Sequence, residues 1–399
     1  MSRVGLTLRA SRVLLAPRLR RTLRGMVQFV VVVGAAAAVG AALLLAAGVD
    51  PVAAYRDLVL GAVGDRYHLS ETLVRAVPIA VIALGVVPAL RARVFTIGAE
   101  GQLAVGALTS TVAVLALDTL PVPLSLAAGA VAGAAGGALW ALLPALLRGY
   151  ARVNEILSTL MLNYVAGFGL LWVLRTALSG PEGLATPRSA DLAESARIPT
   201  LLPGTRLHWG VVVVLIAAAA VAWWIRSPRG FAYDVYATHP AMAARMGVRP
   251  VAAILSTMLV GGAAAGLAGW MQVAGVQGRL YPSVAGGLGF TGLVVALLGG
   301  LRPVGVVAVA LLFGVLATGA EGLQVGSGVP APLATVLQAL LLGGVALSAA
   351  ATYRRSRQAP TYESEVEPGP AATQGSPDEQ ANDAVEPLGS EPPRREGSG

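Results

Sequence analysis

The sequence predicts an all-α polytopic membrane protein with about ten transmembrane helices, and three observations carry this prediction. First, 55% of the 399 residues are hydrophobic and only 13% are charged, with a mean hydropathy of +0.70, a composition foreign to a soluble domain. Second, the apolar runs are about 17 to 25 residues long, which suits a helix that must cross about 30 Å of hydrocarbon. Third, arginines gather in alternate loops between these runs, as the positive-inside rule requires.

Ten apolar segments follow one another along the chain, separated by polar, glycine-containing or proline-containing stretches. An alternative stays open, because two glycine-rich stretches are interrupted by polar or turn-forming residues and would also fit eight spans joined by two re-entrant segments. Those two stretches are 95–106 and 281–292. The ten predicted spans are about 26–48, 72–90, 103–117, 124–147, 155–174, 209–225, 251–274, 284–300, 303–323 and 331–350.

Arginine placement predicts the orientation of the chain in the plasma membrane. Residues 1–25 form a basic arm with seven Arg, and placing this arm in the cytoplasm gives the cytoplasmic segments 19 Arg against seven in the outer loops. An even number of spans then places both termini in the cytoplasm. The first apolar run, 26–48, exceeds the roughly 7 to 15 residues of a signal-peptide core, so we expect an uncleaved first span.

The chain therefore divides into a basic cytoplasmic arm (1–25), a transmembrane domain (26–352) and a cytoplasmic tail (353–399). The last forty residues are rich in Pro, Glu, Ser and Gly and hold nine acids, which predicts disorder. Residues 1–358 carry 27 Arg against 12 acids. This basic excess follows the membrane topology and favours contact with anionic lipid over binding to nucleic acid.

Missing residue types exclude several kinds of chemistry. The chain has no Cys, and all 29 of its basic residues are Arg, so it offers no thiol ligand, Schiff-base lysine or Walker A lysine. Three scattered histidines, all in predicted loops, predict no metal site. The glycine pattern of Gly287 to Gly292 follows no soluble strand and indicates close helix packing, as do the rows Gly129, Gly133, Gly137 and Gly262, Gly266. We expect no catalytic residue and no cofactor, with any ATP hydrolysis performed by a separate subunit.

A polar insert, RARVFTIGAEGQLAVG from Arg91 to Gly106, interrupts two apolar spans. Hydrocarbon does not accommodate such groups, so the insert must line a cavity, pack against protein or lie at the membrane surface. Two interpretations stay open: Thr96 and Glu100 stabilise the start of the following helix, or side chains here contact a solute. Asn163, in the fifth span, fits either a pore contact or an interhelical hydrogen bond. The candidate path residues are Phe95, Thr96, Glu100, Gln102 and Asn163.

Other charged residues lie near predicted span ends. Glu71 and Arg75, one turn apart, predict a local ion pair. Glu321 fits either a gate residue or a solvated carboxylate.

The loop 226–250 is the longest predicted cytoplasmic loop within the bundle. Its centre, His239 to Gly247, begins with a proline and ends with a glycine, which predicts one short helix outside the membrane. Such a helix can dock on a partner, rest on lipid headgroups or simply connect two spans.

Four segments together resemble the permease subunit of bacterial ABC importers, within the branched-chain amino acid, ribose and galactose permease superfamily. They are VFTIGAEGQLAVGAL (94–108), VNEILSTLMLNYVA (153–166), THPAMAARMGV (238–248) and GLGFTGLVVALLGGLRP (287–303). The resemblance covers residues 26–350 and is nearest to the nucleoside branch, which works with a lipoprotein of the basic membrane protein type. Sugar permeases of the superfamily carry a GGIDLSVG-like segment where this chain has FTIGAEGQ.

The resemblance implies a division of labour. ATPase subunits would dock on a coupling helix around Pro240, Ala243, Ala244 and Gly247, an external lipoprotein would deliver a nucleoside, and a second permease subunit would complete the pore. It also implies two halves of opposite topology, beginning near residues 72 and 251, each with a glycine-rich helix break. The break glycines are Gly98, Gly101, Gly286, Gly287 and Gly289.

Several departures and alternatives accompany this interpretation. Thr96, His239 and Arg302 stand where the family more often has asparagine. A sugar permease is the main alternative substrate class. An ion-gradient-driven secondary transporter would need ionisable groups deep in its spans, and a membrane-embedded enzyme would need a catalytic cluster that this sequence does not offer.

Overall fold

The computed structural model describes residues 27, 30–117, 119–180 and 187–357, with side chains as far as residue 348. The predicted basic arm (1–25) and nearly all of the predicted acidic tail lie outside the described residues. The described part is almost entirely helical. After a first helix, Val30–Ala46, come α2 (Pro51–Val63), α3 (Arg66–Arg91), α4 (Ala99–Ala116), α5 (Val122–Gly149), α6 (Glu155–Thr176), η1 (Glu194–Ala196), α7 (Gly210–Arg226), α8 (Pro228–Thr238), α9 (Pro240–Arg245), α10 (Pro250–Met271), η2 (Gln272–Gln277), α11 (Leu288–Leu298), α12 (Pro303–Ser327) and α13 (Ala331–Arg357).

The number of membrane-crossing helices agrees with a polytopic protein. Within the described residues, seven helices are long and apolar enough to cross a membrane, and up to nine are if each of two sharply bent helix pairs is one span. Each predicted span coincides with a helix, with one difference in length. For the predicted span 284–300 the helix α11 has only 11 residues, about 16 Å at 1.5 Å per residue. The rest of that segment, up to Gly287, is not helical, so a single full-length helix was the wrong expectation there.

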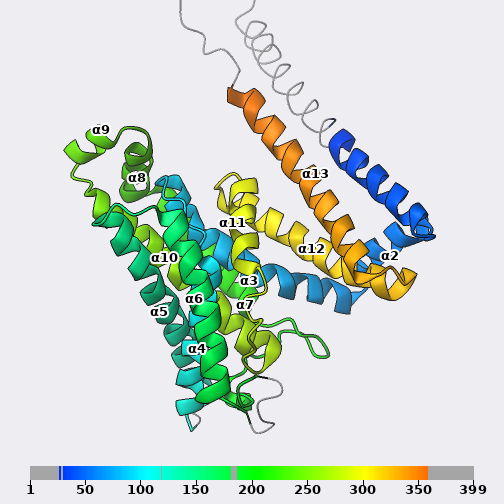
Figure 1. Cartoon of the computed structure of the whole chain (residues 1–399), viewed down its shortest axis with the longest axis horizontal. Coiled ribbons are helices and arrows are strands. Elements are labelled where there is room, and N and C mark those ends of the chain that lie inside the picture. The colour runs from blue at the N-terminus through cyan, green and yellow to red at the C-terminus, as the bar shows by residue number, and fades with distance from the viewer. Residues whose placement is uncertain (1–26, 28–29, 118, 181–186, 358–399) are drawn as a thin grey trace, which may run out of the picture. The chain divides into compact units, whose positions relative to one another are not determined.

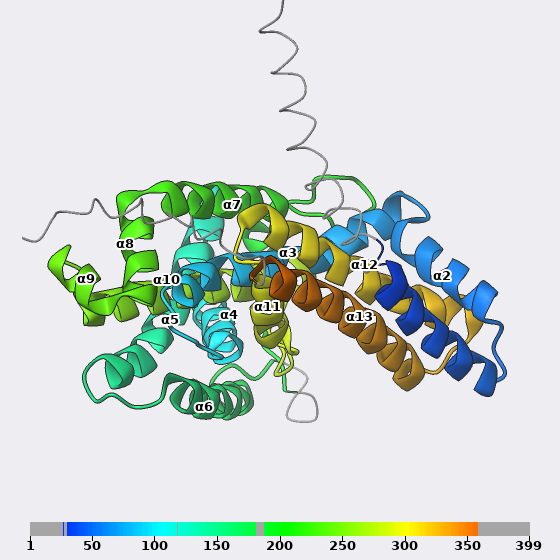
Figure 2. The same cartoon turned by 90° about the horizontal axis from the view of Figure 1, so that it is seen from above.

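Helix α3 forms the centre of the bundle. Its sequence from Val74 to Ala89 is apolar on every side, and all of these residues except Arg75 are buried, as expected for a helix surrounded by protein. It packs against α10, α12, α11 and α7, and Figure 2 shows it between them.

The glycine rows act as predicted by letting helices approach closely. A Cβ atom on Gly266 of α10 would lie only 2.1 Å from the carbonyl oxygen of Gly133 on α5, and one on Gly137 would lie 2.2 Å from that of Gly262. Gly106 of α4 meets Gly266 in the same way, at 2.2 Å. Helices α4, α5 and α10 therefore touch backbone to backbone, which maximises dispersion contacts where lipid supplies no hydrophobic driving force.

Helices α3 and α10 run in opposite directions. Arg91, at the end of α3, pairs with Asp234 of α8, close to where α10 begins, whereas Glu71 near the start of α3 lines a cavity with Gln277 at the end of η2. Each helix is followed by a non-helical break and another helix, α4 or α11. The order helix, break, helix thus occurs twice with opposite directions, as expected for inverted halves.

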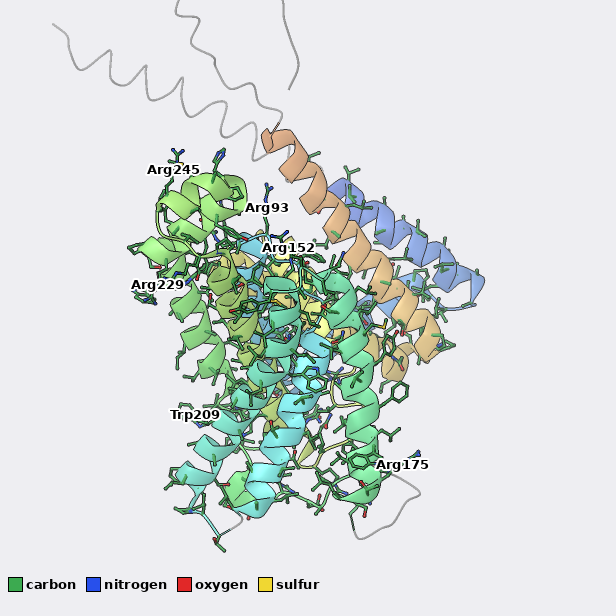
Figure 3. The ribbon with its side chains drawn as sticks, turned by 60° about the vertical axis from the view of Figure 1, so that its left-hand side comes forward. Arg93, Arg152, Arg175, Trp209, Arg229 and Arg245 are labelled. Atoms are coloured by element: carbon green, nitrogen blue, oxygen red, sulfur yellow. The ribbon has the colours of Figure 1, made fainter. Side chains whose placement is uncertain are left out.

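Arginines mark one end of the bundle. Arg93, Arg152, Arg229 and Arg245, all from loops predicted to be cytoplasmic, lie toward the same end in Figure 3, whereas Arg175 and Trp209 lie toward the other. The alternation found in the sequence is therefore a spatial band of positive charge.

Candidate translocation path and coupling arm

The two helix breaks meet at the carboxylate of Glu100. Its Oε1 accepts a hydrogen bond from the backbone N–H of Gly287 at 2.7 Å, and its Oε2 accepts one from Gly289 at 2.8 Å. Gly287 is the N-cap of α11, so the carboxylate satisfies donors at the positive end of that helix. Glu100 lies in the first turn of α4 (Ala99–Ala116), as predicted, and its carboxylate also accepts hydrogen bonds at the start of α11. We call Glu100, Gly287 and Gly289 the junction.

Close backbone approach explains the glycines on the α11 side. A Cβ atom on Gly289 would lie 2.2 Å from the backbone nitrogen of Glu100. Gly286 and Gly287 have φ angles of +49° and +83°, which side chains other than glycine adopt with difficulty. The two breaks thus approach closely at Gly289 because it lacks a side chain, whereas Gly286 and Gly287 are required by their positive φ angles.

Asn163 ties α6 to the other side of the junction. Its amide donates to the carbonyl of Ile97 at 3.0 Å, and its Oδ1 accepts from the N–H of Gly101 at 3.0 Å. A Cβ atom on Gly101 would lie 2.9 Å from that Oδ1. The interhelical hydrogen bond anticipated from the sequence is present, and it holds the break before α4 in place.

The remaining candidate path residues surround the same break. Thr96 and Gln102 are buried, with 5% and 3% exposure, and the Thr96 hydroxyl accepts a 3.3 Å hydrogen bond from the N–H of Gly98. Phe95 is partly buried against the main core. A Cβ atom on Gly98 would lie 2.9 Å from the Gln102 amide nitrogen, which explains the glycine at the start of α4.

A cavity lies at the end of the bundle opposite α8 and α9, and we call it the loop-side cavity. Its volume is about 310 Å³. Its walls come from α3, the loop before α7, η2, the break before α11 and α12. The polar groups that line it are Glu71, Arg75, Arg206, Gln272, Gln277 and Ser283.

Four charged residues form one network at this cavity. Glu71, with a side chain only 7% exposed, pairs with Arg206 at 2.5 Å and with Arg75 at 3.4 Å. Arg75 also pairs with Glu321 at 2.6 Å. The predicted Glu71–Arg75 pair is thus half of a larger network, and Glu321 is one of its members. Two guanidinium groups and two carboxylates balance, so the buried charge of Glu71 is compensated.

The loop before α7 is fastened along the end of α10. Ile198 donates a hydrogen bond to the carbonyl of Ala274, and Leu192 donates one to that of Gly278, each at 2.9 Å. His208 is buried beside Gly275, where a Cβ atom would lie 2.8 Å from its Nε2. Burial lowers the pKa of His208 to about 4. The neutral ring accepts a 3.0 Å hydrogen bond from the N–H of Gly210, which places the ring proton on Nε2.

Helices α8 and α9 form an arm at the opposite end, beside the start of α10 (Figure 1). The predicted short helix is confirmed as α9, Pro240–Arg245, and α8 precedes it. Gly247 has a φ angle of +83° and ends the arm in open space. Pro240 and Ala244 are exposed, whereas Ala243 has no exposed surface. Ala243 therefore packs inside the arm, whereas Pro240 and Ala244 lie on its surface.

One ion pair joins the arm to the central helix. The Nε of Arg91, at the end of α3, donates to Oδ1 of Asp234 on α8 at 3.0 Å, and its Nη2 pairs with the second carboxylate oxygen. Such a bidentate contact fixes both the distance and the relative orientation of Arg91 and Asp234. The same helix α3 therefore contacts the arm at one end and carries Glu71 and Arg75 of the loop-side cavity at the other.

Sequence reasoning missed Arg206, Gln272 and Gln277. Nothing in a single sequence indicates that the loop carrying Arg206 folds back over α3. Gln272 lies near the end of the predicted span 251–274 and Gln277 just after it, and the sequence alone does not indicate that both amides line one cavity.

Comparison with known proteins places the chain in a family. Residues 68–346 match the family described as branched-chain amino acid transport system / permease component. The chain is a member of this permease family. It is 36% identical to a glucose ABC transporter permease protein of Haloferax volcanii, over 78% of this chain and 85% of that protein. It is 35% identical to a guanosine ABC transporter permease protein of Bacillus subtilis, over 78% of this chain and 90% of that protein.

A nucleoside ABC transporter permease protein of Lactococcus lactis is more distant, with 28% identity over 77% of this chain and 87% of that protein. No solved structure matches the chain. The chain is therefore the membrane-embedded permease component of an ABC transporter, a multi-pass protein whose family works with ATPase and substrate-binding components.

Proposed function

We propose that this chain forms the translocation path for a neutral nucleoside in an ABC importer. The observation that carries the neutral class is the charge balance of the loop-side cavity. Glu71, Arg75 and Arg206 line this cavity, and Glu321, outside it, supplies the second carboxylate of their network, so both guanidinium groups already have carboxylate partners and offer no free charge to the phosphate of a nucleotide. The paired groups also leave no separate partners for the ammonium and carboxylate of an amino acid, although the family description mentions amino acids. Buried charges without partners are costly, so an uncharged solute suits this cavity best.

Two observations support a nucleoside within the neutral class. The break segment FTIGAEGQ resembles that of the nucleoside branch and not the GGIDLSVG-like segment expected of sugar permeases, and two similar proteins are named as guanosine and nucleoside permeases. A sugar is the second candidate, favoured by the 36% identity to the glucose permease protein. The secondary-transporter alternative is set aside by membership of the ABC permease family.

The proposed partners follow from the two ends of the bundle. The arm carries exposed Pro240, Met242 and Ala244 at the end that holds the arginine band, which we assign to the cytoplasm together with both termini. An ATPase subunit docks there, and the Arg91–Asp234 pair conveys its movement to α3. A substrate-binding lipoprotein docks at the loop-side end, and a second permease subunit, or a second copy, completes the pore. Anionic lipid headgroups contact the arginine band.

The path residues proposed from the sequence gather at the junction. Phe95, Thr96, Glu100, Gln102 and Asn163 all lie at or beside the break before α4. A change in the angle between α4 and α11 would move these groups together, because Glu100 bonds to the α11 backbone and Asn163 to the α4 break.

Uptake of labelled solutes by cells with and without the chain tests the proposal. We expect chain-dependent uptake of guanosine or inosine and none of leucine. Chain-dependent uptake of glucose with no effect on nucleosides would establish the sugar candidate instead.

A further inference from the structure

Two residues that line the loop-side cavity each have a buried polar atom without a hydrogen-bond partner in the described part of the chain. One is Nε of Arg75, a donor that lies 3.4 Å from Oε1 of Glu71 in an ion pair without a hydrogen bond, and the other is Oε1 of Gln277, an acceptor. A buried polar atom without a partner costs free energy, so native proteins rarely retain one without a reason. A donor and an acceptor left open in one cavity indicate a ligand that carries both kinds of group.

The backbone at this wall has an unusual form that brings two amides to the cavity. Helix α10 passes into the π-helical segment η2, Gln272–Gln277. In an α-helix, side chains five residues apart point about 140° away from each other at 100° per residue. The wider π turn, with its i to i+5 hydrogen bonds, places them nearly one above the other. Gln272 and Gln277 accordingly line the same cavity.

The size and charge of the cavity narrow the ligand further. Its volume of about 310 Å³ lies at the small end of ligand pockets, which hold about 300 to 1,000 Å³. Its three charged groups, Glu71, Arg75 and Arg206, are paired within the cavity or with Glu321 outside it. A compact, uncharged molecule with adjacent donors and acceptors is the best match, and a nucleoside offers them on its base edge and on its ribose hydroxyls.

We infer that the loop-side cavity is a solute-binding subsite within the permease itself, where Gln277 accepts a hydrogen bond from the transported nucleoside and Arg75 donates one. The inference rests on the proposed function and adds to it. The permease then selects its solute and does not merely conduct what a binding lipoprotein delivers. Arg206 and Gln277 also line a second cavity of about 460 Å³, so the two cavities adjoin at these residues.

The absence of cysteine from the chain permits a direct test of binding. Val276→Cys introduces a single thiol into the wall of the cavity, and Val325→Cys introduces one at a position of α12 that is 88% exposed and outside this cavity. Membrane vesicles that hold the whole transporter are treated with a membrane-impermeant maleimide, with and without saturating inosine. We expect inosine to slow labelling of the thiol at position 276 and to leave labelling at position 325 unchanged.

Two further solutes identify the part of the nucleoside that binds. Purine riboside has the ribose of inosine but lacks the N–H and carbonyl of the base edge. Protection by inosine alone assigns the subsite to the base edge, and protection by both solutes assigns it to the ribose hydroxyls. Glucose is the third solute, because protection by glucose alone would support the subsite while refuting the nucleoside class.

Gln277→Met keeps the length of the side chain and removes its acceptor, and Gln324→Met makes the same change on α12, outside the cavity. Loss of one neutral hydrogen bond should raise the inosine concentration needed for half-maximal protection by roughly fivefold in Gln277→Met, and leave it unchanged in Gln324→Met. Unchanged labelling at position 276 with every solute, in vesicles that still take up nucleoside, would overturn the subsite and leave the proposed function standing. Equal effects of the two methionine variants would also refute the role of Gln277.

Discussion

Replacing Glu100 by Gln tests whether the junction holds the two helix breaks together. The carboxylate accepts from two backbone N–H groups, of Gly287 and Gly289, at 2.7 and 2.8 Å. A glutamine keeps one acceptor oxygen, but its NH₂ group then faces the second N–H donor, and the negative charge at the start of α11 disappears. Loss of one charge-assisted hydrogen bond costs about 1.5 to 3 kcal/mol, and loss of the charge near the helix N-terminus costs about 0.3 to 1 kcal/mol more.

Hydrogen exchange measures this loss where it occurs. A decrease of about 2 to 4 kcal/mol in the free energy of local opening corresponds to exchange that is faster by roughly 30-fold to 900-fold. We expect this acceleration in the peptide that contains Gly287 and Gly289, measured by mass spectrometry on the detergent-solubilised protein. Glu155→Gln is the matched control, because Glu155 also begins a helix but pairs with Arg148, at 3.1 Å. Unchanged exchange at Gly287 and Gly289 in Glu100→Gln, or equal acceleration in the control, would refute the junction.

Three further predictions concern the arm, the helix packing and the loop before α7. Asp234→Arg should abolish transport because it places two guanidinium groups, at positions 91 and 234, next to each other. The double variant Arg91→Asp with Asp234→Arg should restore part of the transport activity if the ion pair conveys movement from the arm to α3. A double variant that is as inactive as Asp234→Arg alone, at equal membrane abundance, argues against that role. Gly266→Leu should destabilise the fold by about 3 kcal/mol or more through forced separation of α5 and α10, seen as loss of folded protein in size-exclusion chromatography, whereas Gly167→Leu, with no atom near its Cβ position, should be tolerated. Burial lowers the pKa of His208 to about 4, so between pH 6.5 and 4 the ring stays neutral in the folded state but gains a proton in the unfolded chain, whose pKa is about 6.5. The stabilising contribution of the neutral ring is therefore complete above pH 6.5, and the free energy of unfolding falls by up to about 3 kcal/mol as the pH decreases toward 4. His208→Gln should make the thermal midpoint less dependent on pH over this range.

The features that recur along the chain were predictable from the sequence. Length and hydropathy located a helix at each expected span, because the bilayer sets a physical length. The glycine rows of α5 and α10 follow from helical periodicity, and the proline and glycine around α9 act through local backbone preferences. These local signals can be read without knowing which segments contact each other in the fold.

Features that depend on contacts between residues far apart in the sequence were not predictable from one sequence. Glu100 begins α4, yet it bonds to Gly287 and Gly289, almost two hundred positions later. In the same way, Arg206 reaches Glu71 across 135 positions. The interruption before α11 was visible in the glycine-rich stretch 281–292, but one sequence left open whether a full span or a shorter helix follows it, and Gly286 and Gly287, both with positive φ, lie directly before the short helix.

The role of Gln277 was hidden for a different reason. A π turn inserts no distinctive residue and shifts only the direction in which the following side chains point. The sequence therefore indicated an amide at the end of a span but not the cavity that it faces. Only the three-dimensional arrangement brings Gln277, Arg75 and Arg206 to one wall.

The central claim is that this permease carries a neutral nucleoside with energy from a separate ATPase. The most direct measurement is ATP-driven uptake into proteoliposomes that contain the chain with its ATPase and binding-protein partners, with labelled inosine, glucose and leucine supplied at equal concentration. The account predicts accumulation of inosine that requires ATP, with little glucose and no leucine. Accumulation of leucine, or of glucose without inosine, would contradict it.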